Sequence, residues 1–206
     1  MANTINGDAM IKDKEQTGKP AELSPSGWIT RFLPDEDGSA GGMSKRALDL
    51  ACGGGRHSRL LLARGYQVMA VDRDLSKLGE LRHAPGLTAV GTDLEADLAR
   101  GTPLPFAGQT FDLVVVTNYL HRPLLPSLVA AVAPGGLLLY ETFAAGNTRF
   151  GRPSNPDFLL KPGELLDVVR GKLRVLAYET LEVRRPKPAV LQRIAAKNAP
   201  PASNGR

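Results

Sequence analysis

The residues best suited to chemistry stand in a glycine-rich stretch, residues 49–55, with the sequence DLACGGG. An acidic residue comes near the end of a short apolar run, and three glycines then lead into a segment with helical spacing. Glycines let the backbone turn sharply and approach a ligand closely, and the first turn of the following helix presents free N–H groups. The stretch therefore predicts a cradle for a nucleotide-like ligand. A strand-to-helix turn with a structural role alone is the alternative.

Two further carboxylates follow the next two predicted strands, since Asp72 ends YQVMAVD and Asp93 ends LTAVGTD. In an open α/β sheet the ligand lies across the carboxyl ends of the strands, where an acid after the second strand accepts ribose hydroxyls. Asp93, one strand further, is placed to meet an adenine amino group. Each acid alone could equally be a helix N-cap. Three acids at three consecutive strand ends favour a single adenosine-bearing ligand.

The elements that must position these acids alternate along the chain, which predicts a parallel sheet with covering helices. Apolar runs predict strands at residues 46–51, 67–71, 87–91, 111–117 and 137–143. Helical spacing predicts helices at residues 57–63, 75–82, 124–133 and 163–169. A further short helix is expected in residues 23–33, where Trp28 and Phe32 are either a lid over the ligand or ordinary packing residues.

The last two predicted strands, residues 173–182 and 189–196, are separated by the six residues VRRPKP. Parallel neighbours need a connection of about a dozen residues or more, so these two strands must pair antiparallel as a hairpin.

Residues 49–55, with Asp72, Asp93 and the strand FDLVVVT, resemble the class I S-adenosylmethionine-dependent methyltransferases over residues 43–196. CGGGRHSRLLLARGYQVMAVD is most similar to the bacterial branch that includes the tellurite-resistance methyltransferase, and residues 117–125 and 140–165 resemble an uncharacterised bacterial subfamily. The resemblance implies an α/β, Rossmann-like, mostly parallel seven-stranded sheet with helices on both faces. The implied strand order is 3-2-1-4-5-7-6 with strand 7 antiparallel, in agreement with the hairpin. The implied cofactor is S-adenosyl-L-methionine.

The same resemblance implies a set of cofactor contacts at strand ends and in the glycine stretch. They are Asp49, the backbone of Ala51, Gly53 and Gly55, the Arg56 guanidinium and the Thr117 carbonyl for the methionine end, Asp72 for the ribose, and Asp93 with the Leu94 N–H for the adenine. Ala51 departs from the family, which usually has glycine there.

Methyl transfer from a sulfonium requires mainly that the acceptor be aligned with the methyl group, and a base helps where the acceptor must lose a proton. Tyr119 and His121, just past the fourth strand, are the predicted catalytic residues, and Glu141 near the end of the fifth strand is a third candidate. Packing or capping is the alternative for the first two. His57 is expected only to orient the glycine turn.

The segment after the fifth strand is long and polar, as loops that border binding sites often are. Asn147, Phe150 and Asn155 in this segment are predicted to border the acceptor pocket, with structural padding as the alternative.

Length and composition predict one domain over residues 23–197, with a disordered leader at 1–22 and a disordered tail at 198–206. The longest apolar runs are too short to cross a membrane. The single cysteine, Cys52, excludes an internal disulfide, and no Cys/His cluster has zinc spacing. We therefore expect a cytoplasmic protein without a bound metal, as a monomer or weak dimer.

The formal net charge of +5 is concentrated at one end, because residues 183–206 hold six basic residues and no acidic one. Nucleic acid is thus a possible partner, but a solvated tail is favoured, and a small-molecule acceptor is expected. Two rival functions stay open: an NAD(P)-dependent Rossmann oxidoreductase, and a non-catalytic cofactor- or RNA-binding module of the same fold. Ser58 argues against the first rival, since it stands where the dinucleotide motif needs a third glycine.

Overall fold

The computed structural model describes residues 24–34, 45–185 and 187–199. The predicted leader, residues 1–22, lies outside the described residues, as do residues 200–206 of the predicted tail. Asn198, the first residue of that tail, is held to the sheet: its backbone pairs with Gly135 and Gly136, and its side chain donates to the Val132 carbonyl. These contacts lie one residue past the predicted domain end at residue 197, and the domain bounds themselves stay a prediction.

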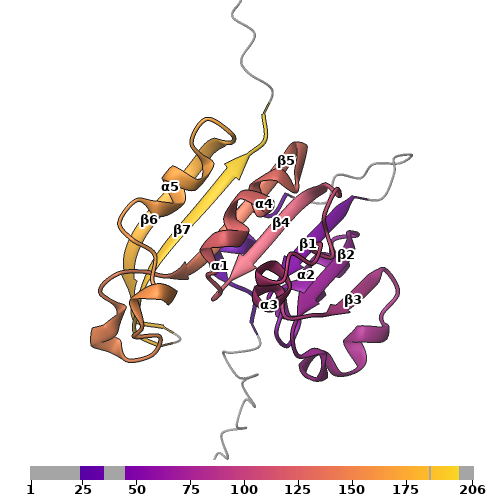
Figure 1. Ribbon diagram of the computed structural model, residues 1–206, viewed down its shortest axis with the longest axis horizontal. Helices are drawn as coiled ribbons and strands as arrows, with labels where there is room; N and C mark the ends of the chain where they lie inside the picture. Colours follow the sequence, from indigo (N-terminus) through magenta and orange to yellow (C-terminus); the bar gives the residue numbers. More distant parts are fainter. Residues whose placement is uncertain (1–23, 35–44, 186, 200–206) are drawn as a thin grey trace, which may run out of the picture.

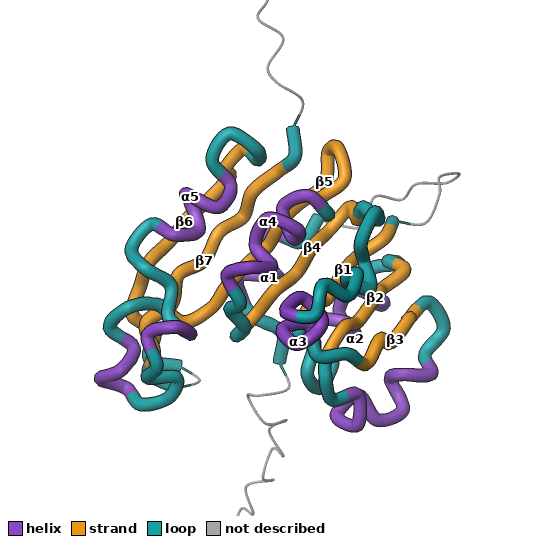
Figure 2. Tube along the Cα trace, viewed as in Figure 1, coloured by secondary structure: helices purple, strands orange, loops and turns teal. Residues whose placement is uncertain are grey.

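A seven-stranded sheet in the order β3-β2-β1-β4-β5-β7-β6 forms the centre of the molecule (Figures 1 and 2), which confirms the predicted topology. Neighbours from β3 to β5 pair in parallel, and β7 pairs antiparallel with both β5 and β6. The strands are β1 Arg46–Leu50, β2 Gln67–Asp72, β3 Leu87–Gly91, β4 Phe111–Thr117, β5 Val132–Phe143, β6 Arg174–Val183 and β7 Ala189–Lys197.

Helices cover both faces of this sheet, and their apolar residues form two core clusters. The α-helices are α1 Gly27–Phe32, α2 Arg56–Ala63, α3 Leu94–Ala99, α4 Leu125–Ala130 and α5 Glu164–Val169. Residues of α3, α4 and α5 pack in one cluster, and residues of α1 and α2 pack in the other. Figure 1 shows α4 and α5 in front of the strands and α1 behind them. The sequence did not predict α3, whose six residues are too few for a clear periodicity.

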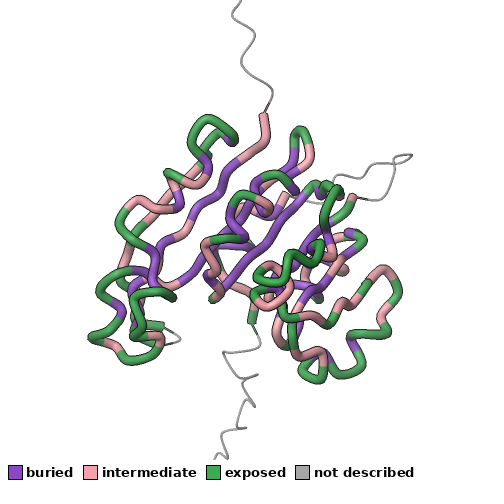
Figure 3. Tube along the Cα trace, viewed as in Figure 1, coloured by how far each residue is buried: buried purple, intermediate pink, exposed green. Residues whose placement is uncertain are grey.

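The central strands are buried on both faces, as Figure 3 shows. In β4 only Asp112 is exposed, and in β1 only Arg46. A strand covered on both faces reads as a continuous apolar run, which is why FDLVVVT was recognisable from sequence.

The predicted helix at residues 75–82 is instead a 3₁₀ segment, η2 Leu75–His83, interrupted at Gly79. Gly79 has φ 52° and ψ −133°, which is not a right-handed helical conformation. Glycine adopts this conformation at little cost because it has no Cβ. Leu78 and Leu81, on either side of Gly79, are buried against the sheet. Packing of these two side chains therefore outweighs helical continuity here.

The predicted helix at residues 124–133 is shorter, and its last residues belong to β5. A 3₁₀ turn, η3 Arg122–Leu124, precedes α4, which ends at Ala130. Gly136 lies within β5, where a Cβ would come within 2.9 Å of the Phe111 carbonyl oxygen. Glycine at this position permits a close approach of two strands.

Two more 3₁₀ turns, η4 Asn147–Phe150 and η5 Pro156–Phe158, lie in the long connection between β5 and α5. Within the described ranges, no helix has the length and apolar character needed to cross a membrane.

Candidate cofactor site

Asp49 is buried in β1, with 1% of its surface exposed. The Ser58 hydroxyl, on α2, donates to Asp49 Oδ2 at 2.5 Å. Burial raises the pKa of Asp49 to about 6, and the Ser58 hydrogen bond and the Arg56 charge offset part of this shift. The carboxyl group of Asp49 thus lies beside the glycine turn with a raised pKa. A positively charged ligand group bound next to it would favour the ionised carboxylate.

The glycine turn uses left-handed backbone at alternate residues. Ala51, Gly53 and Gly55 have φ values of 54°, 53° and 72°. Alanine adopts this region less readily than glycine does, so the departure from the family at Ala51 is accommodated with local strain. A Cβ on Gly55 would lie 2.4 Å from a methyl carbon of Leu81, which explains why this position requires glycine.

The eight-residue helix α2 begins directly after this turn, with Gly55 as its N-cap and no side-chain capping hydrogen bond. Ser58 N–H in this first turn bonds to the Asp49 carboxylate, and the amide groups that precede it are suited to an anion such as a carboxylate. Arg56, the first residue of α2, adds a positive charge there. This end of the site can therefore hold an amino acid-like group, with its carboxylate at α2 and its ammonium toward Asp49.

Asp72, the last residue of β2, is held rigidly by backbone groups. Its Oδ2 accepts from Gly53 N at 2.8 Å, and its Oδ1 accepts from Asp74 N at 3.0 Å. Each carboxylate oxygen can accept more than one hydrogen bond, so both retain capacity for a ligand hydroxyl. The Gly53 contact also joins the glycine turn to the end of β2.

Asp93 caps α3, as the structural alternative predicted. Its Oδ1 accepts from the Glu95 and Ala96 amides, both at 3.1 Å. Among the described residues, no hydrogen bond to its Oδ2 is found, so this oxygen is open to a donor such as an amino group. Leu94, whose N–H was the second predicted contact, is the first residue of α3, and its side chain is buried in the core.

Thr117, at the carboxyl end of β4, faces His57. Thr117 Oγ1 lies 3.4 Å from His57 Nδ1, and His57 Nε2 accepts from the Ser26 backbone N–H at 3.0 Å. His57 is 1% exposed, and burial lowers its pKa to about 3. It is therefore a neutral imidazole that joins the segment before α1 to the end of β4, a larger role than orienting the turn.

Tyr119 and His121, the predicted catalytic residues, both lie beside Glu95 of α3. His121 Nδ1 is 3.8 Å from Glu95 Oε2. Burial raises the pKa of the Tyr119 phenol, and the negative charges of Glu95 and Asp93 raise it further. Because Glu95 is two residues past Asp93, both side chains lie toward the β3 end of the site.

Glu141 of β5 is the acidic group nearest the other end of the site. It stands opposite Thr117 in the strand register and is 7% exposed. Its carboxylate accepts from Ser26 Oγ at 2.8 Å and from Arg193 Nη1 at 3.1 Å. Arg193 in turn pairs with Glu179 on β6. Arg193 is therefore an internal ion-pair residue and not part of an exposed basic surface.

The residues predicted to border the acceptor pocket have different surroundings. Asn147 is 1% exposed; its side chain accepts from the Val190 N–H and donates to the Pro153 carbonyl, which favours a role in holding the loop. Asn155 is exposed and caps η5 through the Asp157 N–H. Phe150 is half-buried against the core, with the Arg149 guanidinium 4.9 Å from its ring.

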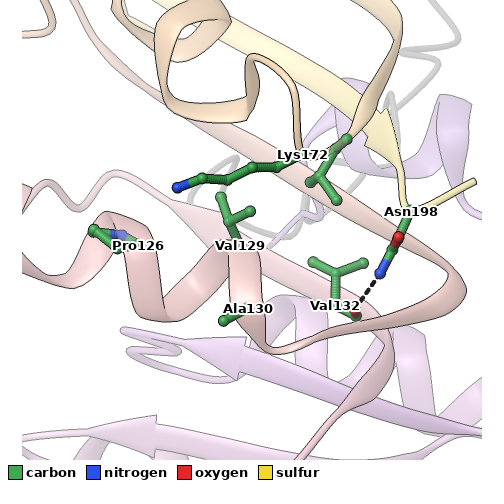
Figure 4. Close-up of a pocket in the computed structure, with 7 residues that line it drawn as sticks. Pro126, Val129, Ala130, Val132, Lys172 and Asn198 are labelled. Atoms are coloured by element: carbon green, nitrogen blue, oxygen red, sulfur yellow. Dashed lines mark hydrogen bonds between the residues drawn. The ribbon is translucent and has the colours of Figure 1, made fainter.

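Two surface hollows lie away from this site, at the amino ends of β4 and β5. One, of about 280 Å³, lies between α4 and the segment leading into β6, where Figure 4 shows the Lys172 side chain extending across Val129. The other, of about 350 Å³, lies on the opposite side of α4 beside Phe106 and Thr110. Neither contains a predicted site residue.

Four residues of this site carry roles that sequence reasoning did not assign: Ser26, Ser58, Glu95 and Arg193. Ser58 was noted only because it is not glycine. The local signal that could have found it is its position one helical turn after the cradle, on the side of α2 that faces β1. Ser26, Glu95 and Arg193 contact residues that are at least 24 positions away in the chain or on another strand. Local spacing therefore does not indicate these contacts.

The comparisons agree with this geometry. A family model described as "Methyltransferase domain" matches residues 47–136. A ubiquinone biosynthesis O-methyltransferase of Burkholderia cenocepacia is 33% identical over 121 residues, which are 56% of this chain and 49% of that protein. A trans-aconitate 2-methyltransferase of Paracidovorax citrulli is 32% identical over 105 residues, 48% of this chain and 38% of that protein.

The chain therefore spans about half or less of the length of these curated relatives. Among solved structures, TehB from Haemophilus influenzae matches with a TM-score of 0.59 at 19% identity, over 82% of this chain and 59% of that chain. At this identity the match supports the fold alone. The family match covers the glycine turn, β1 to β4 and the start of β5, so this part of the chain is similar to methyltransferase domains.

Proposed function

We propose that this chain binds S-adenosylmethionine across the carboxyl ends of β1 to β4 and transfers its methyl group to a small-molecule acceptor. The observation that carries the proposal is the placement of Asp49, Asp72 and Asp93 at three adjacent strand ends. The strands β1, β2 and β3 that lead to these acids are neighbours in the sheet, and α2 follows β1 directly after the glycine turn.

The groups present fit an amino acid joined to a nucleoside. The first turn of α2 and Arg56 take the carboxylate, while Asp49 and the Thr117 carbonyl face the ammonium. The backbone of Ala51, Gly53 and Gly55 lines the methionine end. Asp72, already fixed by two backbone N–H groups, accepts the two ribose hydroxyls.

The adenine lies at the end of β3 in this proposal. Asp93 Oδ2 accepts from the amino group, and the Leu94 N–H donates to a ring nitrogen. Because Asp93 Oδ1 is bound to the first turn of α3, the free oxygen is held in one orientation. Tyr119, whose phenol is kept protonated by its surroundings, is suited to contact this half of the cofactor through its ring and hydroxyl group.

S-adenosylmethionine supplies a methyl group on a positively charged sulfur. The acceptor's lone pair forms a bond to that methyl carbon while the carbon–sulfur bond breaks, and the bonding electrons stay on sulfur. The chain's task is to align the acceptor, which alone supplies a large part of the rate. Where the acceptor carries a proton, His121 is the candidate to take it, since its Nδ1 lies 3.8 Å from the Glu95 carboxylate. Tyr119 is less suited because its raised pKa keeps the phenol protonated.

A small acceptor is supported by the names of the relatives, which act in ubiquinone biosynthesis and on trans-aconitate. The loop that contains Phe150 and Asn155 borders the proposed acceptor pocket. Asn147 holds this loop in place through its hydrogen bonds to Pro153 and Val190. We also propose that the protein works in the cytoplasm as a monomer or weak dimer. Its single cysteine, Cys52, is buried and forms no disulfide within the described chain.

The NAD(P)-dependent alternative finds less support. Ser58 is fully buried and bonded to Asp49, where the dinucleotide motif needs glycine for close packing. The antiparallel β7 belongs to the methyltransferase topology.

The test is a transfer assay with methyl-tritiated S-adenosylmethionine and a cell extract separated into small molecules, RNA and protein. We expect label in the small-molecule fraction, at least tenfold less with Asp72→Asn, and an unchanged amount with Asp167→Asn. Asp167 is a matched control, because its carboxylate is exposed on α5 and pairs only with Arg170 among the described side chains. Label in RNA or protein alone would refute the small acceptor, and no label in any fraction would refute the transfer.

A further inference from the structure

His57 has both ring nitrogens engaged, and their partners define its protonation. The Ser26 backbone N–H can only donate, so His57 Nε2, 3.0 Å away, is the unprotonated nitrogen. The single ring proton is therefore on Nδ1, which points at Thr117 Oγ1 at 3.4 Å. One neutral imidazole thus bridges the residue that caps α1 and the residue that ends β4.

Ser26 fixes the position of α1 through every polar group that it has. Its N–H donates to His57, its hydroxyl donates to Glu141 Oε1 at 2.8 Å and accepts from Trp28 N at 3.1 Å, and its carbonyl accepts from Thr30 N. Glu141 also binds Arg193, whose guanidinium lies 4.9 Å from the Trp28 ring. Helix α1 is therefore fastened to the sheet at the same edge as the cofactor site.

His57 is linked to the proposed cofactor site in two ways, by its own position on α2 and by its contact with Thr117. His57 is the second residue of α2, whose first turn receives the ligand's carboxylate in our proposal, and Thr117 is the proposed contact of its ammonium. A ligand that orders α2 and Thr117 also fixes the imidazole in the orientation that accepts from Ser26.

We propose that His57 is a positioning residue that couples docking of α1 to cofactor binding. The inference rests on the proposed function. Coupling between two binding events is reciprocal. The factor by which the cofactor raises the equilibrium constant for α1 docking is therefore the factor by which docked α1 raises the affinity for the cofactor. With two hydrogen bonds involved, a coupling of about fivefold is expected, at the low end of measured couplings.

Trp28, the single tryptophan of the chain, provides a direct readout. It lies on α1, is 2% exposed, and donates from Nε1 to the Ile194 carbonyl. Acrylamide quenching of its fluorescence therefore reports how often α1 leaves the sheet. In the wild-type protein we expect S-adenosylhomocysteine to lower the quenching constant. If saturating S-adenosylhomocysteine binds but leaves that constant unchanged, the coupling does not exist.

The variant test compares His57→Phe, which keeps a ring but removes both hydrogen bonds, with His57→Gln, which keeps one acceptor and one donor. His83→Phe is the control for the same chemical change at an exposed histidine outside the site. For His57→Phe we expect about fivefold weaker S-adenosylhomocysteine binding by calorimetry and a quenching constant that no longer responds to it. His57→Gln should restore most of both, and His83→Phe should match the wild type.

Equal affinity and equal quenching response in His57→Phe and wild type would overturn the proposal. Circular dichroism checks that each variant is folded. If His57→Phe does not fold, the wild-type quenching titration and His57→Gln still decide the question. Failure of the proposed function is a different result, namely no binding of S-adenosylhomocysteine by the wild-type protein.

Discussion

Asp49 is buried in the core of the ligand-free protein, yet its proposed role requires an ionised carboxylate. Its carboxyl group lies in the core beside Ser58, and burial raises its pKa from 3.8 to about 6. A carboxyl group with a raised folded-state pKa stabilises the protein below its unfolded pKa, and that stabilisation is lost as the pH rises through the folded pKa. At neutral pH, therefore, Asp49 is ionised at a cost to stability that a ligand ammonium would offset.

The pH dependence of stability tests this account of Asp49. We expect Asp49→Asn to gain stability relative to the wild type as the pH rises from 4 to 7, by up to about 3 kcal/mol at roughly 1.4 kcal/mol per pKa unit. Urea unfolding of both proteins across this range measures the difference. His57 titrates with the opposite sign, but it is present in both proteins and cancels. A difference that stays constant with pH would contradict the raised pKa.

At the scale of residues, the sequence predicted the acids and not their partners. Asp49, Asp72 and Asp93 follow recognisable apolar runs, so their placement at strand ends could be inferred from alternation alone. The contacts of Ser26 with His57, 31 residues away, and of Glu95 with Tyr119 and His121 depend on tertiary packing. Spacing along the chain contains no information about them.

At the scale of elements, Gly55 determines how closely α2 approaches η2. A Cβ at this position would lie 2.4 Å from Leu81 Cδ2 and 2.7 Å from Leu78 Cδ2, and the backbone has φ 72°. Gly65 offers a matched control, because its φ is 78° but no atom lies within 4 Å of an added Cβ.

We therefore expect Gly55→Ala to lower the free energy of unfolding by about 2–4 kcal/mol, from backbone strain and overpacking together. Gly65→Ala should cost only about 1–2 kcal/mol from the strain alone. Chemical denaturation of both variants measures the difference. Equal losses would show that η2 gives way to the added methyl group, contrary to the close packing described above.

The predicted helices and strands agree best with the structure where burial determines the pattern of apolar residues in the sequence. Strand β4 is buried on both faces and reads as a run of apolar residues, whereas the helix predicted at residues 75–82 is interrupted between the buried Leu78 and Leu81. Gly79 between them has φ 52° and ψ −133°, which are not helical angles. Gly136 lies at a close contact of β5 with β4, which local sequence does not reveal.

At the scale of the whole molecule, the strand order follows from simple rules. The alternation of strands and helices requires a parallel sheet, and the six-residue connection forces the last two strands to pair antiparallel. The family resemblance added the exact order, with β7 inserted between β5 and β6. The position of α1 over β5 and β7 could not be predicted, because it depends on Trp28 and Arg193, which are far apart in the chain.

The central claim is that Asp49, Asp72 and Asp93 together bind one adenosine-bearing ligand. Isothermal titration calorimetry of the purified chain with S-adenosylhomocysteine tests it most directly. The account predicts saturable binding of one ligand per chain, weakened at least tenfold by Asp72→Asn and unaltered by Asp167→Asn. An absence of binding heat with both S-adenosylhomocysteine and S-adenosylmethionine, over a range of temperatures, would contradict it.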